Sequence, residues 1–318
     1  MRLEPPIPFG PWLLRERIGV GGMAEVFRAV RTDQGPAGGT EVAIKRLLPH
    51  VAQEETVREL FAREAEALER ITHPNVVAIL DHGESRELPW LAMELIEGAS
   101  LREVLGDRGA QADLAARLPV RVALHLAAEV ARGLAAAWRV AVVHRDISPT
   151  NIQITSDGRV KLVDFGIARL AGAAGHSQGS VRGKLAYLSP EQAEGGLVDG
   201  QTDLFALGVV IYELIVGTPP YQGEDRGAVL DRVIRAGLPD QPLFTAVRPF
   251  SRRPPAELDA AAIVAACAPV DQSAVKALVG ALLSRDRRQR PITGEAAAAA
   301  IGDILGEGDD GVGAAHAR

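Results

Sequence analysis

Two aspartates and an asparagine lie close together in the middle of the sequence. Asp146 and Asn151 belong to the segment HRDISPTN at 144–151, and Asp164 begins the tripeptide DFG thirteen residues after Asn151. Pro149 is incompatible with a helix through this segment, so we expect a loop, and a short hairpin then brings Asp164 back to it. The set offers one carboxylate that can accept the proton of a hydroxyl group and an Asn/Asp oxygen pair for a hard metal ion.

A glycine-rich segment and a lysine precede this set. Residues 19–26 read GVGGMAEV, and glycines let backbone N–H groups approach a polyphosphate without a Cβ in the way. The residues after Ala24 alternate as in a strand, whereas a dinucleotide-binding fingerprint needs a helix there. Lys45 ends the apolar run 42–44, and a buried lysine requires an anion such as phosphate. Taken singly, an ordinary hairpin turn and a solvent-facing lysine explain both features, but their order before 144–166 favours a phosphate site.

A third feature is a carboxylate on the apolar face of a predicted helix. Thr56 and Glu59 fit a capping box at the start of the helix 57–70. Glu64 lies between leucines four residues before and after it, so it shares their face of the helix. A carboxylate on that face is costly unless it meets a cation, and Lys45 is the cation that we expect it to meet.

The elements around these residues divide the chain near residue 97. The first part is strand-rich with one helix, and the second part is helix-rich and alanine-rich. Strands are predicted at 12–18, 25–30, 42–44, 152–155 and 160–163. Long helices are predicted at 118–138 and 202–216, the second ended by Gly217 and two prolines.

Composition limits the classes of function. The chain has 318 residues, 47% of them hydrophobic, which favours one large domain or two packed lobes. A net charge of −6 argues against a nucleic-acid-binding surface. No stretch reaches the roughly 18 consecutive apolar residues of a membrane span. The single cysteine, Cys267, fits a reducing compartment, so we expect a cytoplasmic protein.

In this order and spacing, the motifs resemble those of the protein kinase superfamily, and more closely its bacterial, eukaryotic-like (Hanks-type) Ser/Thr branch. The segments GVGGMAEV, VAIK, HRD and DFG are joined by LSPE at 188–191, by Asp203 and by Arg290-Pro291. The resemblance covers residues 9–305. It implies an α+β, two-lobed protein-kinase fold, with a small β-rich N-lobe (about 9–96) carrying one helix, αC. A larger, mainly helical C-lobe (about 97–305) and a disordered tail (306–318) would follow.

The resemblance implies a role for each residue of the site. Lys45 would hold the α- and β-phosphates of ATP and pair with Glu64. Asp146 would orient the substrate hydroxyl group and accept its proton. Asn151 and Asp164 would ligate Mg²⁺, with Mn²⁺ as an alternative.

The resemblance also implies an adenine pocket below the glycine-rich loop. Met93 would be the gatekeeper, and residues 94–96 would be the hinge that meets adenine through its backbone. Gln153 stands where the family usually has an apolar residue, so only its apolar stem can stack on adenine. The residues expected to contact the nucleotide are Ile18, Gly19, Gly21, Gly22, Val26, Ala43, Lys45, Met93, Glu94, Ile96, Gln153 and Asp164. Two structural contacts are implied as well. Asp203 would brace the segment 144–151, which is the catalytic loop of the family, and Glu191 would pair with Arg290.

Two departures from the family pattern concern the transferred phosphate. The family usually has a lysine two residues after the catalytic aspartate, and this chain has Ser148. The family usually has Gly-Thr before the peptide-binding segment, and this chain has Gly183-Lys184. We hypothesise that the Lys184 ammonium group occupies the missing lysine's space from the other side. The alternative is a solvent-facing loop lysine.

The resemblance also implies regulation by phosphorylation. Kinases with an arginine before the catalytic aspartate, here Arg145, commonly need a phosphorylated activation loop, because the guanidinium group can clamp a phosphate in two hydrogen bonds. Ser177 and Ser180 are the candidate phosphosites, and Ser180 is preferred because it lies nearer Lys184. A dimer that phosphorylates itself in trans is a possible arrangement.

The sequence therefore predicts an ATP-dependent Ser/Thr protein kinase. One alternative is a nucleotide-binding pseudokinase that acts as a scaffold, which Ser148 favours but the complete set of the other catalytic residues opposes. The other alternative is a small-molecule phosphotransferase of kinase-like fold. The LSPE segment, Asp203 and Arg290 oppose it, because they build a peptide groove in the family.

Overall fold

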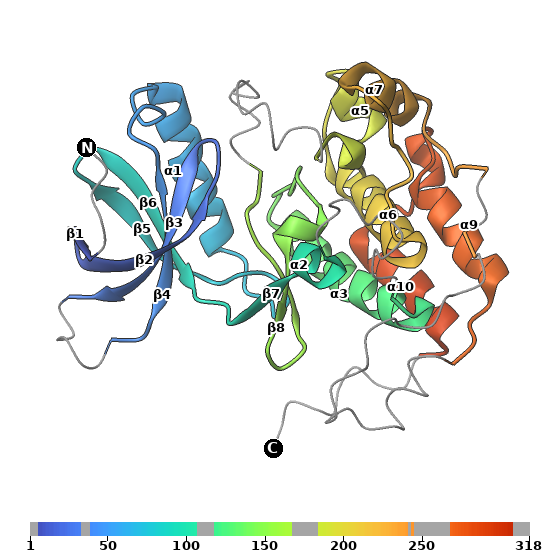
Figure 1. Ribbon diagram of the computed structural model, residues 1–318, viewed down its shortest axis with the longest axis horizontal. Coiled ribbons are helices and arrows are strands. Elements are labelled where there is room, and N and C mark those ends of the chain that lie inside the picture. The colour runs from blue at the N-terminus through green and yellow to red at the C-terminus, as the bar shows by residue number, and fades with distance from the viewer. Residues whose placement is uncertain are drawn as a thin grey trace.

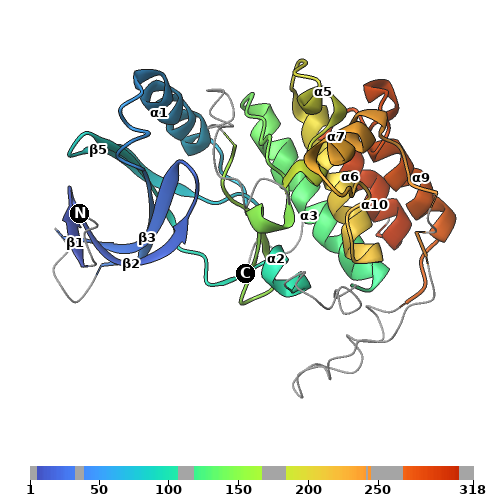
Figure 2. The same cartoon turned by 45° about the horizontal axis from the view of Figure 1, so that its top comes forward.

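The computed structural model describes residues 6–32, 39–106, 118–166, 184–240, 243–244 and 268–307. Two lobes lie side by side, and the short segment after strand β6 (Leu88–Glu94) joins them (Figure 1, Figure 2). One lobe is a sheet with a helix against it, and the other consists mainly of helices. The predicted α+β fold with a β-rich N-lobe and a helical C-lobe is confirmed. Among the described helices, none has the length and apolar character that crossing a membrane requires.

The N-lobe is built on one antiparallel sheet with the strand order β1-β2-β3-β4-β6-β5. Its strands are β1 (Ile7–Phe9), β2 (Trp12–Val20), β3 (Ala24–Arg31), β4 (Val42–Leu47), β5 (Ile79–Ser85) and β6 (Leu88–Glu94). Residues alternate between two faces, so β4 contributes to one apolar cluster through Ala43 and to another through Ile44. The first cluster packs against the helix α1 (Glu55–Glu69) through Val57, Phe61 and Ala65.

The predicted capping box of this helix is wrong, although the helix itself is present. Helix α1 begins at Glu55, so Thr56 already lies inside it, and the N-cap residue Glu54 makes no side-chain cap hydrogen bond. The chain enters the helix from a turn in which the Glu54 carbonyl accepts the N–H groups of Val57 and Arg58. The Glu54 carbonyl, rather than a Thr56 side chain, thus defines the start.

The C-lobe begins with a small sheet, β7-β8-β9, and continues in helices. Its strands are β7 (Gly98–Ser100), β8 (Ile152–Thr155) and β9 (Val160–Leu162). Its α-helices are α2 (Leu101–Leu105), α3 (Val120–Arg139), α5 (Pro190–Ala193), α6 (Gly200–Val216), α7 (Arg226–Arg235), α9 (Gln272–Leu282) and α10 (Gly294–Leu305). Single 3₁₀ turns lie at η2 (Pro149–Asn151), η4 (Leu185–Tyr187) and η5 (Arg287–Gln289).

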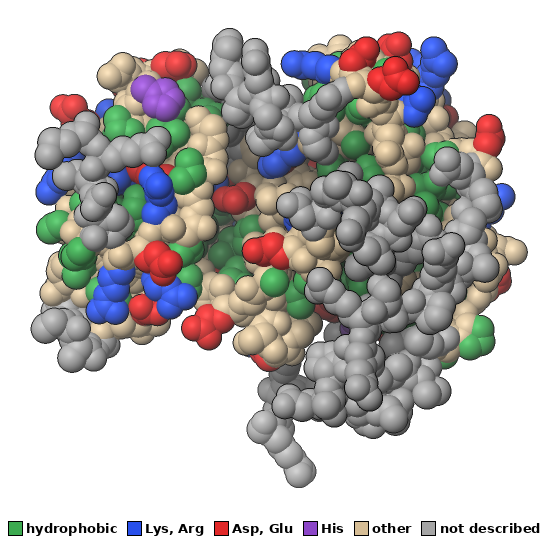
Figure 3. All heavy atoms as spheres, viewed as in Figure 1, with side chains coloured by type: hydrophobic (Ala, Val, Ile, Leu, Met, Phe, Trp, Pro, Cys, Tyr) green, Lys and Arg blue, Asp and Glu red, His purple; other side chains and the backbone are tan. Residues whose placement is uncertain are grey.

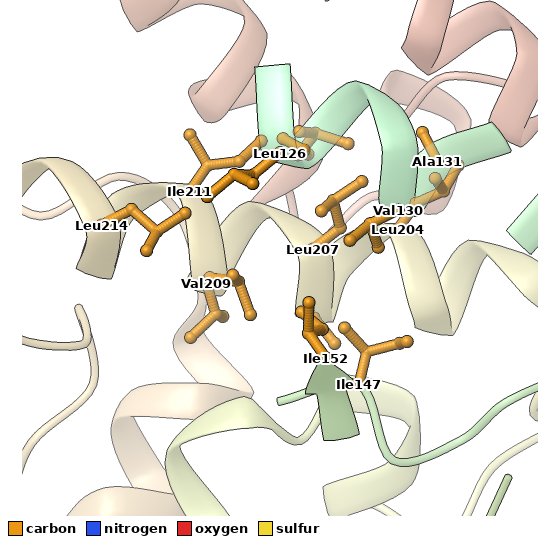
Figure 4. Close-up of a cluster of buried hydrophobic side chains, with 14 of the residues drawn as sticks. Leu126, Val130, Ala131, Ile147, Ile152, Leu204, Leu207, Val209, Ile211 and Leu214 are labelled. Atoms are coloured by element: carbon orange, nitrogen blue, oxygen red, sulfur yellow. The ribbon is translucent and has the colours of Figure 1, made fainter. Parts of the chain in front are cut away.

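Helix α6 is the centre of the C-lobe. Nearly every one of its residues is buried, because α3, α9 and α10 pack around it and the catalytic loop lies against it. In Figure 4, Leu204 and Leu207 of α6 meet Val130 of α3, while Ile147 and Ile152 approach the same helix from another side. The helix ends at Gly217, whose φ of 92° is the left-handed conformation that the sequence predicts for a C-cap glycine.

The first residue of α6 is in unusually close contact with α3. A Cβ atom on Gly200 would lie 1.4 Å from Cζ2 of Trp138, so the indole ring occupies the space that any other side chain would need. Gly280 in α9 is different, because a Cβ atom there would meet nothing within 4 Å.

Replacing Gly200 by alanine should therefore lower the free energy of unfolding by about 1–3 kcal/mol, since Trp138 must move. Gly280→Ala is the matched control and should be neutral or stabilising by about 0.5–1 kcal/mol, because it removes helix-interior flexibility without a clash. Urea unfolding of the three proteins measures both effects. Equal stability of Gly200→Ala and wild type would show that the Trp138 contact is not a constraint.

Candidate active site

The catalytic loop is held from below by one buried carboxylate. Asp203 in α6 is 1% exposed, and it accepts the backbone N–H groups of His144 at 2.8 Å and Arg145 at 2.7 Å. Burial raises the pKa of Asp203 to about 7, although these two hydrogen bonds act in the opposite direction. The brace that the sequence predicts is confirmed. Arg145 has a left-handed φ of 64°, a conformation that this pair of bonds stabilises.

His144 fixes the loop through its imidazole ring. Its ring stacks at 4.4 Å on that of Phe165, and Nε2 lies 3.1 Å from the carbonyl oxygen of Val163. The Asp146 N–H group donates to Nδ1 at 3.4 Å. One nitrogen accepts and the other donates in the neutral tautomer that fits these contacts. Burial lowers the pKa of His144 to about 4, and the nearby Asp146 carboxylate only partly offsets this.

Asp146 and Asn151 are connected across a single 3₁₀ turn. Pro149 is the first residue of that turn, where its missing N–H group costs nothing, so the predicted loop contains one helical turn. Asn151 is buried, and its Nδ2 group donates to the Asp146 carbonyl oxygen at 2.7 Å and to Oδ2 at 3.0 Å. The amide nitrogen is thus committed to Asp146, so the amide oxygen is the atom of this side chain that could ligate a cation.

Asp164 lies opposite this turn and contacts the lysine of β4. Lys45 pairs with Val26 of β3 and Leu91 of β6, and its Nζ atom donates to Asp164 Oδ1 at 2.8 Å. The Lys45 ammonium group lowers the pKa of Asp164, although the partial burial of this half-exposed carboxylate acts in the opposite direction. Burial lowers the pKa of Lys45, but the carboxylates of Asp164 and Glu64 outweigh it, so the net shift is upward. Asp164 has a φ of 54°, a strained conformation typical of functional sites.

The ion pair of Lys45 differs from the one that the sequence predicts. Glu64 is 8% exposed, and within the described part of the chain its Oε2 atom has no hydrogen-bond partner. The ammonium group of Lys45 contacts Asp164 instead. Burial raises the pKa of Glu64 well above its ordinary value, with the charge of Lys45 acting against it. The half-exposed Asp164 keeps its charge at lower cost, which explains why it takes the contact.

Lys184 points at the same site from the other side. Its Nζ atom donates to Asp146 Oδ2 at 2.6 Å, so it does not merely face solvent. Ser148 is 1% exposed, and among the described residues its Oγ atom has no hydrogen-bond partner. Ser177 and Ser180, the candidate phosphosites, lie outside the described residues.

Four of the residues expected around adenine belong to or pack against one apolar cluster of the N-lobe. Ala43 of β4 pairs with Met93 of β6, and Val26 and Ile96 pack against the same cluster. Gly19 pairs with Val26 across the glycine-rich hairpin. Figure 3 shows a recess between the two lobes with hydrophobic and acidic side chains in it.

The other predicted nucleotide contacts lie apart from this cluster. Ile18 is half-exposed on β2, and Gln153 belongs to the C-lobe strand β8.

Sequence reasoning missed a buried ion pair at the hinge. Lys161 of β9 donates to Glu94 Oε1 at 2.5 Å, and the same oxygen accepts the N–H group of Ala78 at 2.8 Å. The side chain of the first hinge residue is thereby tied to both lobes. A signal was available, since Lys161 lies between two buried apolar residues of a strand and therefore requires an anion.

The predicted pair of Glu191 and Arg290 is confirmed. Both terminal nitrogens of the guanidinium group donate to the carboxylate, at 2.7 and 3.1 Å, and Arg290 also lies 4.9 Å over the ring of Phe205. This bidentate pair ties the segment before α6 to the segment before α10.

A surface hollow of about 790 Å³ lies elsewhere on the C-lobe. It is lined by Trp138, Asp199, Gly200, Gln201, Arg285, Asp286, Arg287, Arg288 and Ile292. None of these residues belongs to the site described above, so the hollow is not the place for the nucleotide.

A β-rich lobe and a helical lobe that bring a lysine, an asparagine and two aspartates together define the phosphotransferase class with a two-lobed fold. The family model described as "Protein kinase domain" matches residues 12–300, so the chain belongs to the protein kinase family. Members of this family use ATP and a divalent metal ion and act on protein substrates.

Several named proteins are similar to this chain. "Probable serine/threonine-protein kinase PknB" of Corynebacterium glutamicum is 40% identical over 67% of this chain and 32% of its own length. "Serine/threonine-protein kinase PknL" of Mycobacterium tuberculosis is 37% identical over 74% of this chain and 57% of its own length. "Tyrosine-protein kinase MasK" of Myxococcus xanthus is 36% identical over 73% of this chain and 36% of its own length. The chain thus spans from about a third to somewhat more than half of these relatives.

A solved structure, that of the M. tuberculosis PknI kinase domain, superposes with a TM-score of 0.67. It is 26% identical, and the match covers 96% of this chain and 100% of that one.

The buried neutral His144 should make the protein lose stability as the pH falls. Its pKa is about 4 when folded and 6.5 when unfolded, so the folded state binds fewer protons between these values. The contribution of neutral His144 to the free energy of unfolding is therefore fully present above pH 7, and it is lost as the pH falls from 6.5 towards 4. Between pH 7 and pH 5, wild type should lose about 2 kcal/mol more than His144→Phe, which cannot ionise.

Urea unfolding at both pH values measures this difference. His125 is exposed, so His125→Gln should behave as wild type does. Parallel pH dependences of wild type and His144→Phe would contradict the assignment.

Proposed function

We propose that this chain is a Ser/Thr protein kinase that transfers the γ-phosphate of Mg·ATP to protein hydroxyl groups, its own included. The observation that carries the proposal is the position of Asp146. Its carboxylate lies between the Asn151 amide and the Lys184 ammonium group, on a loop whose backbone Asp203 holds. The names of the relatives PknB and PknL support serine and threonine as acceptors.

The donor set fits a magnesium ion. The amide oxygen of Asn151 and the carboxylate of Asp164 are hard oxygen ligands, which Mg²⁺ and Mn²⁺ prefer. The metal ion would supply positive charge to the phosphate oxygens. Lys45, tied to Asp164, is the residue that would move onto the α- and β-phosphates, with the buried Glu64 as its second carboxylate.

In the chemical step one proton is transferred, one bond forms and one bond breaks. Asp146 orients the substrate hydroxyl group and accepts its proton as the oxygen bonds to the γ-phosphorus. The bond from that phosphorus to the bridging oxygen breaks, and ADP leaves. Asn151 keeps Asp146 in place, because its amide nitrogen donates to the carboxylate of Asp146 and to the backbone carbonyl oxygen of the same residue.

The adenine ring would lie against the apolar cluster below the glycine-rich hairpin. Val26, Ala43 and Met93 are its N-lobe contacts, and Gln153 would approach it from β8. The backbone of residues 94–96 would meet the adenine edge. The ion pair of Lys161 with Glu94 keeps that backbone in position.

The catalytic unit would comprise residues 9–305, with the lobes meeting near residue 96; most of the tail predicted at 306–318 lies outside the described residues. Because ATP is the phosphate donor, the domain would act in the cytoplasm. Phosphorylation at Ser177 or Ser180 and clamping of the phosphate by Arg145 would regulate it, and a dimer would allow the transfer in trans.

A nucleotide-binding scaffold is the second candidate, and Ser148 is the observation that favours it. Because Ser148 is a buried residue with a neutral hydroxyl group, it provides no positive charge to a transferred phosphate. The scaffold and the enzyme make different predictions for Asp146, since only the enzyme needs a proton acceptor.

Asp146→Asn should reduce phosphate transfer from radiolabelled ATP, with Mg²⁺ or Mn²⁺, by about 10²–10⁴-fold, because the proton acceptor is lost. ATP binding, measured by calorimetry, should persist because Lys45 and Asp164 are unchanged. Asp231→Asn on the exposed side of α7 is the matched control and should leave transfer intact.

Phosphoamino-acid analysis of the labelled product identifies the acceptor. Phosphoserine and phosphothreonine support the proposal, and phosphotyrosine alone would contradict it. Wild type that binds ATP without transferring phosphate would establish the scaffold instead.

A further inference from the structure

The phosphoryl group needs positive charge beyond the metal ion. In the transition state its negative charge spreads over three oxygens, and a fixed cation beside them lowers the barrier. Lys45 is drawn to Asp164 on the N-lobe side of the site. On the side of the proton acceptor, the loop position two residues after Asp146 is Ser148, which is buried and cannot carry charge.

Lys184 places an ammonium group on this side of the site, beside the carboxylate of Asp146. Its Nζ atom lies 2.6 Å from Asp146 Oδ2, the oxygen that also accepts from Asn151 at 3.0 Å. An ammonium group has three donors, so it can keep this contact and still donate to a phosphoryl oxygen beside the carboxylate. The phosphoryl group must arrive there, because Asp146 takes the proton of the attacking hydroxyl group.

The backbone that follows Lys184 is anchored, which restricts the position of its side chain. It directly precedes the buried turn η4, and the hydroxyl group of Tyr187 in that turn donates to Glu213 of α6. Arg102 of α2 completes this buried network at 2.7 Å from Tyr187 and 3.0 Å from Glu213.

Asp203 lies on the same helix and holds the catalytic loop. Helix α6 therefore positions both the carboxylate and the ammonium group that meets it.

We propose that Lys184 is a catalytic residue that stabilises the transferring phosphoryl group, in the place where Ser148 cannot. The inference rests on the proposed kinase activity and adds to it the source of the missing charge. The cation reaches the proton acceptor from the segment before η4 rather than from the catalytic loop. The charge of the site is thereby kept although its position in the sequence has changed.

Steady-state kinetics on the whole chain test this proposal. Lys184→Thr should lower kcat by about 10²-fold and change the KM for ATP by less than about threefold, because the charge acts in the transition state. Lys184→Met removes the charge and keeps the stem, so it should lose kcat to the same extent. Lys184→Arg keeps the charge and should retain most of the activity. Lys276→Thr, on the exposed side of α9, is the control and should match wild type.

Transplanting the charge gives a sharper result. In the Lys184→Thr background, Ser148→Lys returns a cation to the loop beside Asp146 and should raise kcat at least tenfold. A double variant no more active than Lys184→Thr would overturn the claim that charge is the missing quantity. The same follows if Lys184→Met keeps the kcat of wild type, whatever Lys184→Thr does.

The experiment separates this inference from the function on which it rests. Wild type without any phosphate transfer would refute the kinase itself. An active wild type whose kcat is unaffected by Lys184→Met would refute only the role of Lys184. Calorimetric ATP binding by each variant shows that a loss of kcat is not a loss of fold.

Discussion

The carboxylate of Asp203 determines where the catalytic loop can lie. It projects from α6, a helix buried on nearly every side, and it accepts the consecutive N–H groups of His144 and Arg145. The next residue is Asp146, the proposed proton acceptor, so its position is fixed through one peptide unit. Because an unpaired carboxylate at this depth would be costly, packing of the helix and placement of the loop depend on each other. The left-handed backbone of Arg145 is one result.

The same helix fixes the opposite wall of the site. Glu213, about three turns further along α6, receives the hydroxyl group of Tyr187 and the guanidinium group of Arg102. Both Asp203 and Glu213 are buried acids whose partners lie on other segments, so each one ties a loop to the core of the lobe. Because α6 is held rigidly in the hydrophobic core, its two carboxylates hold the segments that carry the polar residues of the site in fixed positions.

Much of this arrangement could be predicted from the sequence, for physical reasons that differ from element to element. The spacing of Asp146, Asn151 and Asp164 sets a loop and a hairpin, and local geometry then brings them together. The partner of Lys45 could not be predicted in this way. Two carboxylates lie within its reach, and their relative burial, which only the fold determines, gives the contact to Asp164 and leaves Glu64 with a raised pKa. The wrong capping box likewise reflects a turn at Glu54 that motif matching does not detect.

The contrast between Ser148 and Lys184 shows what the chemistry requires of a sequence. Phosphoryl transfer needs charges at given points in space, and the chain position that supplies each charge is free as long as the fold fixes it. A lysine on the loop would share the support of Asp203, whereas Lys184 depends on Tyr187 and its contact with α6. The Lys184 ammonium group lies beside Asp146 Oδ2, so the proposed phosphate site would depend on the packing of two segments rather than one.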